Sequence, residues 1–102
     1  MTNRFAVRKI NHQGSVTVNI CDEELVDSKV SEGKLEINIT RDYFGQQMVE
    51  EDEAAELLHS CTIANLVGKR IVNKAVGMKL ASGLSVRTIS GVPFLMIFKF
   101  QH

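Results

Sequence analysis

The sequence predicts an α+β fold, a two-layer α/β sandwich in which two main helices lie on one face of a mixed or antiparallel sheet of about five strands. Three observations lead to this prediction. Several short segments alternate polar and apolar residues with the period of two that is typical of strands. One long segment in the second half repeats apolar residues every three or four positions, as amphipathic helices do. Glycine-containing turns separate these segments.

Length and composition predict a single domain over residues 1–102, because no linker or change of composition divides the chain. The hydrophobic content of 44% is sufficient for a continuous core. Lys and Arg together number 12, as do Asp and Glu, so the whole molecule lacks the positive field that draws proteins onto nucleic acid. Any nucleic-acid binding must therefore come from a local patch.

The first half of the chain predicts strands. Residues 5–10 and 15–20 flank a polar segment that ends at Gly14, and they predict a β-hairpin with one buried face. Asp22 then precedes two glutamates, which suits the start of a short helical turn capped by that aspartate. The strict alternation over Lys34–Thr40 predicts another strand.

The second half predicts helices followed by two strands. Apolar spacing from Glu50 indicates a helix, and a Ser or Thr near Cys61 is expected to cap a second helix that runs to about Leu80. Residues 86–89 and 92–100 then predict a strand pair. The predicted core comprises Val16, Val18, Ile20, Leu35, Ile37, Ile39, Leu57, Ile63, Val67 and Ile71.

Three neighbouring residues, Cys21, Asp22 and Glu23, are the weak candidates for catalysis. A thiol nucleophile needs a lowered pKa, and adjacent acids oppose that, so a buried structural cysteine is the favoured interpretation. The acids could orient a substrate or a metal ion, but helix capping explains them better. The sequence therefore leaves catalysis uncertain and favours a protein that is not an enzyme.

A basic face on the second predicted helix is the best clue to a partner. Five polar residues gather opposite the apolar side of that helix: Asn65, Lys69, Arg70, Asn73 and Lys74. Such a face can follow a phosphate backbone, although solvated lysines on an amphipathic helix are the plainer alternative. A Tyr–Phe pair at residues 43 and 44 could stack on unpaired bases, or simply cover the core.

The last predicted strand is apolar on both faces. One face carries Val92, Phe94, Met96, Phe98 and Phe100, which leaves Leu95 and Ile97 as a surplus apolar face. An exposed apolar face is typical of an interface, so Leu95 and Ile97 predict a protein partner or a homodimer.

Recognisable motifs for cofactors and metals are missing from the sequence. The histidines lack metal-ligand spacing, and no phosphate-binding or dinucleotide-binding loop occurs, so we expect no metal and no cofactor, and no small-molecule ligand can be identified. The longest apolar run is too short to span a bilayer, which needs about 20 residues. We therefore expect no membrane association and a reduced, cytoplasmic protein.

Several strings together resemble the archaeal domain of unknown function 424 family. They are Cys21-Asp22-Glu23-Glu24-Leu25, Glu32-Gly33-Lys34, Tyr43-Phe44-Gly45, Ile63-Ala64-Asn65-Leu66-Val67-Gly68 and Gly91-Val92-Pro93. The resemblance implies a compact two-layer α/β domain of the archaeal cytoplasm without an established activity, encoded by genes that accompany translation genes. We therefore expect a noncatalytic module that binds RNA or the ribosome, with a protein-interaction or homodimerisation module as the alternative and an enzyme that uses Cys21 as a weaker one.

Overall fold

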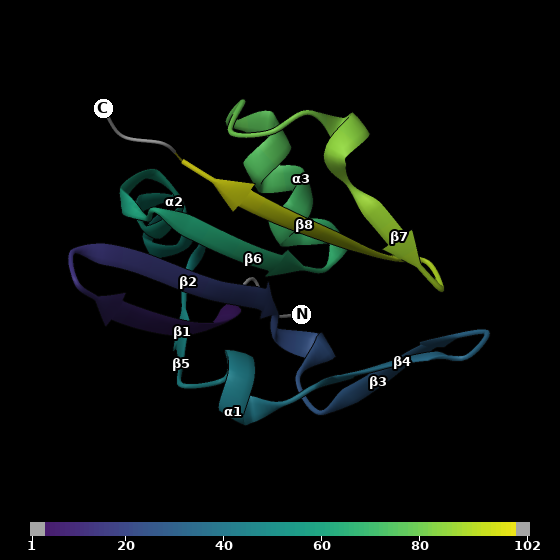
Figure 1. The fold of residues 1–102 in the computed structure, drawn as a ribbon. Coiled ribbons are helices and arrows are strands. Elements are labelled where there is room, and N and C mark those ends of the chain that lie inside the picture. Colours follow the sequence, from purple (N-terminus) through teal and green to yellow (C-terminus); the bar gives the residue numbers. More distant parts are fainter. Residues whose placement is uncertain (1–3, 100–102) are drawn as a thin grey trace.

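The computed structural model describes residues 4–99, which form an α+β fold with two sheets (Figure 1). The larger sheet is mixed and has six strands rather than about five, in the order β5-β1-β2-β6-β8-β7. Its strands are β1 (Phe5–His12), β2 (Ser15–Asp22), β5 (Gln47–Val49), β6 (Ile63–Val67), β7 (Arg87–Ile89) and β8 (Val92–Phe98). A separate hairpin consists of β3 (Ser28–Glu32) and β4 (Leu35–Ile39).

Residues 4–99 contain three α-helices, which lie on two sides of the larger sheet. Figure 1 shows α2 (Glu51–Ser60) and α3 (Lys69–Gly77) on one side, and α1 (Arg41–Phe44) with the β3–β4 hairpin on the other. Two short 3-10 turns, η1 (Glu23–Leu25) and η2 (Gly83–Ser85), precede β3 and β7. The only parallel pair among the described strands is β2 with β6.

The predicted N-terminal hairpin is confirmed. β1 and β2 pair antiparallel along their full length, and Gln13 and Gly14 turn the chain with positive φ angles of 50° and 83°. Two successive residues with positive φ match the right-handed twist of the flanking strands, which explains why glycine is favoured there.

The predicted helix from about residue 62 to Leu80 is wrong over its first part. Residues 63–67 form β6, and only Lys69–Gly77 form α3. Between them Gly68 has φ 118° and ψ 152°, so a helix cannot pass through this residue. The prediction of a helix depended on the four-residue spacing of Ile63, Val67 and Ile71. A strand that lies between two neighbouring strands, as β6 does, also carries apolar residues on both faces, so the same residues suit β6.

Two groups of buried side chains lie on opposite faces of the larger sheet. Beneath α2 and α3, residues such as Val18, Ile20, Leu66 and Leu58 form the larger group. The smaller group lies on the other face, where Phe44 and Ile39 pack near Val67, among others. Within the predicted core, Val18, Ile20, Ile39, Val67 and Ile71 are buried, and Val16, Ile37, Leu57 and Ile63 are half-buried. The prediction for Leu35 is wrong, because this residue is exposed in β4.

The prediction that Leu95 and Ile97 form an exposed apolar face of the last strand is wrong, because the opposite face of β8 is the exposed one. Leu95 and Ile97 are buried in the group beneath the helices, so neither is available at the surface as a protein interface. Met96 and Phe98, on the opposite face, are 58% and 56% exposed. Both faces of β8 are apolar, and the position of α3 decides which one is covered. Phe100 and His102 lie outside the described residues.

Candidate functional site

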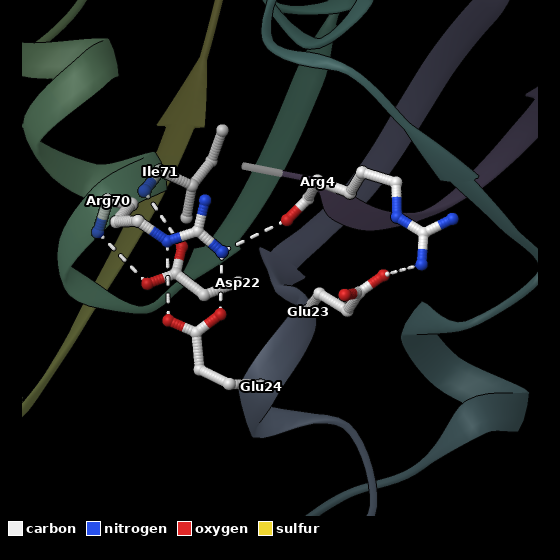
Figure 2. A network of polar contacts seen from close by, with 6 residues as sticks. All are labelled: Arg4, Asp22, Glu23, Glu24, Arg70 and Ile71. Carbon is white, nitrogen blue, oxygen red and sulfur yellow. Dashed lines mark hydrogen bonds and ion pairs between the residues drawn. The ribbon is translucent and has the colours of Figure 1, made fainter. Parts of the chain in front are cut away.

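The acidic motif after β2 holds the start of α3, as Figure 2 shows. The side chain of Asp22 is buried, and its two carboxylate oxygens accept hydrogen bonds from the backbone amides of Arg70, at 3.0 Å, and Ile71, at 2.9 Å. It makes no capping hydrogen bond to η1, so the prediction that Asp22 caps the adjacent helical turn is wrong. Asp22 caps a helix that begins much later in the chain.

Gly68 is required by this cap. A Cβ atom built at Gly68 would lie 2.5 Å from Oδ2 and 2.9 Å from Oδ1 of Asp22, which is closer than real side-chain carbons approach. Its φ of 118° also belongs to a region that glycine alone occupies readily. The acidic string that ends β2 and the glycine that ends β6 therefore form one structural unit.

Arg70 connects this unit to the N-terminal strand. Its guanidinium donates to both carboxylate oxygens of Glu24, at 2.6 and 3.3 Å, and to the backbone carbonyl of Arg4 at 3.0 Å. It also lies over the ring of Phe5, 4.7 Å from the ring centre. The hydrogen bond from Arg70 holds the pKa of Glu24 below its ordinary value. Glu23 pairs with Arg4 at 2.8 Å.

The predicted catalytic trio does not converge. Cys21 is fully buried among the residues on the face opposite α3, Asp22 is occupied by the cap, and Glu23 pairs with Arg4. Burial, reinforced by the charges of Asp22 and Glu24, raises the pKa of Cys21 to about 12. A thiol in this environment stays protonated at neutral pH. Burial also raises the pKa of Asp22, against the opposing effect of its two backbone hydrogen bonds.

The predicted basic face is divided by the fold. Asn65 lies on β6 and not on the helix. Arg70 is neutralised by Glu24, and Lys74 pairs with Glu51 at 2.8 Å, an interaction whose hydrogen bond also lowers the pKa of Glu51. Of the five residues predicted to bind nucleic acid, only Lys69 and Asn73 are exposed. The helix therefore offers much less free positive charge than its sequence suggests.

A different surface lies on the side of the sheet away from α2 and α3. The strand register aligns two rows of side chains there, which we call the open face: Arg8, Asn19, Asn65 and Met96 in one row, and Ile10, Thr17, Ile63 and Phe98 in the next. Asn19 is buried, but Met96 and Phe98 are exposed and the other five side chains are half-buried. The open face thus combines apolar and aromatic surface with a central pair of amides.

A groove of about 630 Å³ runs beside the open face. Residues of β4, α1, β6 and β8 line it, together with Ser85 and Arg87. Its lining includes the aromatic rings of Tyr43 and Phe94, the amide of Asn65 and the exposed side chain of Met96. Among the described residues Arg87 is the only charged one that lines it, so the formal charge at the groove is positive.

Most of this surface was not recognisable from the sequence. Asn65 was identified, but on a helix, and the Tyr43–Phe44 pair was expected either to stack on bases or to cover the core. The signal for the open face lies in the alternation of Asn65 with Ala64 and Leu66, which is compatible with a strand. Reading residues 63–67 as a strand would have aligned Asn65 with Asn19 and the exposed side of β8.

Residues 4–99 contain no cluster of three or more His, Cys, Asp or Glu side chains suited to holding a metal ion. None of the helices within this range is long and apolar enough to cross a membrane.

Comparison with known proteins identifies a family and a related fold. A family model described as a protein of unknown function (DUF424) matches residues 10–100. A crystal structure of an uncharacterized conserved protein from Methanopyrus kandleri is similar with a TM-score of 0.80. The two chains are 17% identical, and the similarity covers 97% of this chain and 96% of the other. No curated protein matches the chain.

Proposed function

The chain belongs to the DUF424 family of proteins of unknown function, and we propose that it is a noncatalytic module that binds single-stranded RNA on its open face and in the adjoining groove. The observation that carries this proposal is the side of the sheet that bears no long helix, where exposed Phe98, Met96 and Tyr43 lie near a groove whose only charged lining residue, within residues 4–99, is Arg87. The proposed binding surface therefore lies on the face of the sheet opposite α3, whereas the sequence predicted nucleic-acid binding on the helix.

The exposed rings favour unpaired nucleotides. Tyr43 is 49% exposed, and Phe98 is 56% exposed on a strand where its ring lies at the sheet surface. Bases stack on such rings with about 1–3 kcal/mol per base, and stacking requires that the base be free of a duplex. Phe94 and Met96 line the groove together with Tyr43 and add to its apolar surface.

Arginines supply the charge that a phosphate backbone needs. Arg87 lies in the groove, and Arg8 stands at the other end of the row that contains Asn19 and Asn65. Neither arginine makes an ion pair with a carboxylate among residues 4–99, although Arg8 donates to the backbone carbonyl of Asp42 at 2.8 Å. Both guanidinium charges are therefore free for phosphate.

The groove also favours binding over catalysis. Its lining contains no histidine, cysteine or carboxylate within the described part of the chain, so it lacks a group that could serve as an acid or a base near neutral pH. Cys21 is fully buried and protonated at neutral pH.

The test is fluorescence polarisation with labelled single-stranded RNA of roughly ten nucleotides, measured across a salt series. We expect Phe98→Ala to weaken binding about tenfold through lost stacking, and Arg87→Ala to weaken it and reduce the salt slope by about one. The matched control replaces Lys69 and Lys74, on the helix side, with alanine and should bind as wild type does. Absence of binding at low salt, or loss only in the helix variant, would refute the proposal.

A second candidate function, homodimerisation, is favoured by the unpaired edge of β8. Gly68 donates to the carbonyl of Pro93 and Lys99 donates to the carbonyl of Thr62, each at 2.9 Å, so odd-numbered residues of β8 bond toward β6. The backbone groups of Met96 and Phe98 therefore point to the other edge, where β7 ends its pairing at Phe94. β7 is the edge strand of the sheet, but it leaves residues 95–98 of β8 unpaired on that side, and this apolar, uncharged stretch is a template for a second copy.

Antiparallel pairing of two β8 strands about Ile97 would oppose Met96 of each copy to Phe98 of the other. Sedimentation velocity across a concentration series tests this candidate. Met96→Pro removes the outward amide while leaving the bonds to β6 intact, and it should shift a dimer to a monomer. Leu84→Lys, a change at an exposed apolar residue outside this edge, is the control. A wild-type protein that sediments as a monomer at every concentration rules out the dimer.

A further inference from the structure

The two asparagines of the open face form a chain of hydrogen bonds with a fixed direction. Asn19 Nδ2 donates to the backbone carbonyl of Tyr43 at 3.1 Å, and Asn65 Nδ2 donates to Asn19 Oδ1 at 2.8 Å. A backbone carbonyl can only accept, so Asn19 must present its amino group to Tyr43 and its oxygen to Asn65. Asn65 in turn must present its amino group to Asn19. This order sets the orientation of both amides without any choice between nitrogen and oxygen.

The chain ends in an acceptor without a donor. Asn65 Oδ1 is buried and has no hydrogen-bond partner within residues 4–99. A buried acceptor left unpaired costs roughly a factor of ten or more in equilibrium constant, and such groups in native proteins call for an explanation. Turning the amide would break the bond to Asn19, so rotation of the side chain cannot repair the deficit.

Asn65 lines the groove, which indicates where a donor could come from. Met96 is its registered neighbour on β8, on the same face and 58% exposed. An unbranched methionine changes rotamer at low cost, so its movement can open a path from the groove to Asn65 Oδ1. Tyr43 and Phe94 line the same groove and offer surfaces on which a flat ring can lie.

We propose that Asn65 Oδ1 selects cytosine and adenine, accepting a hydrogen bond from the exocyclic amino group at N4 of cytosine or N6 of adenine as the base enters the groove. This inference rests on the proposed function. Uracil and hypoxanthine have a carbonyl oxygen at the corresponding ring position. In the same pose two acceptors would then face each other and leave Asn65 Oδ1 unpaired, so these bases bind more weakly.

Matched ligands test the selection on the wild-type protein. The probes are oligocytidylate against oligouridylate and oligoadenylate against oligoinosinate, equal in length and charge, so phosphate binding is the same within each pair. We expect each amino-bearing oligomer to bind about tenfold more tightly than its carbonyl partner. Asn65→Ala should remove most of this preference, with its fold checked by circular dichroism.

Met96→Ala leaves the asparagine chain intact and serves as a second variant if Asn65→Ala does not fold. It should retain the preference, because it opens the groove without removing the acceptor. Equal binding within both pairs would overturn the selection by Asn65 and leave RNA binding standing. Failure of all four oligomers to bind at low salt would overturn the proposed function and this inference together.

Discussion

Replacing Gly68 with alanine is the sharpest test of the unit that joins β2 to α3. The new Cβ would lie 2.5 Å from Oδ2 of Asp22, so the carboxylate must leave its position. Departure breaks the hydrogen bonds from the amides of Arg70 and Ile71, and loss of a helix cap costs about 0.5–2 kcal/mol. The backbone at φ 118° and ψ 152° adds about 1–3 kcal/mol for any residue with a Cβ.

Together these terms predict a loss of about 1.5–5 kcal/mol in the free energy of unfolding. For a domain of this size the melting temperature should fall by roughly 6 °C or more. Urea unfolding followed by circular dichroism measures the change. Gly77→Ala is the matched control, since Gly77 ends α3 with open space around its Cα, and we expect it to be neutral or slightly stabilising.

A double-mutant cycle separates the two causes. In an Asp22→Ala background the carboxylate is already gone, so Gly68→Ala should cost only the backbone term. An equal cost of Gly68→Ala in both backgrounds would refute the steric argument. A loss below about 1 kcal/mol in the wild-type background would refute the whole reasoning, because it would mean that neither the cap nor the backbone angle matters.

Three further predictions concern the same region. Glu24→Gln should lower the free energy of unfolding above pH 4.5, the ordinary pKa of the group, because only the charged carboxylate pairs with Arg70. The difference from wild type should shrink as pH falls through the lowered folded-state pKa, and also in high salt. A difference that stays constant would contradict the pairing. Arg70→Lys should destabilise the protein by about 0.5–1 kcal/mol in urea unfolding, because a lysine ammonium cannot donate to Glu24 and to the Arg4 carbonyl as the planar guanidinium does. An unchanged urea midpoint would contradict the role of Arg70 in joining these groups. Cys21, with a pKa of about 12, should react with iodoacetamide at pH 8 only as fast as the protein unfolds, and rapid labelling of the native protein would revive the enzyme hypothesis.

Elements with local signals could be predicted from the sequence. The β1–β2 hairpin, β4, α2 and the β7–β8 pair follow from alternation, apolar spacing and turn residues, and the structure confirms them. α1, β3 and β5 were missed because each is short, and β3 and α1 carry little apolar periodicity. Residues 63–80 were assigned to one helix because apolar spacing there suits both periods, and the φ of Gly68 that separates β6 from α3 cannot be read from periodicity.

The candidate site could be predicted only in part, because its key contacts are not local. Asp22 was expected to cap a helix, but the capped helix begins beyond Gly68, and only the parallel pairing of β2 with β6 brings them together. Leu95 and Ile97 were assigned to the wrong side of β8, since alternation defines two faces without saying which one α3 covers. The prediction of a free basic face was wrong because Glu24 and Glu51, from distant parts of the chain, pair with Arg70 and Lys74 on α3.

The cap on α3 also has a consequence for the order of folding. The amides of Arg70 and Ile71 bond to a side chain 48 and 49 residues earlier, so the first turn of α3 is completed only when β2 lies beside β6. A helix of 9 residues gains little from its own propensity, so we expect α3 to form late and to depend on the sheet. The first amides of a helix ordinarily fray, whereas here their hydrogen exchange should require opening of the β2–β6 pair and should be as slow as that of the central strands.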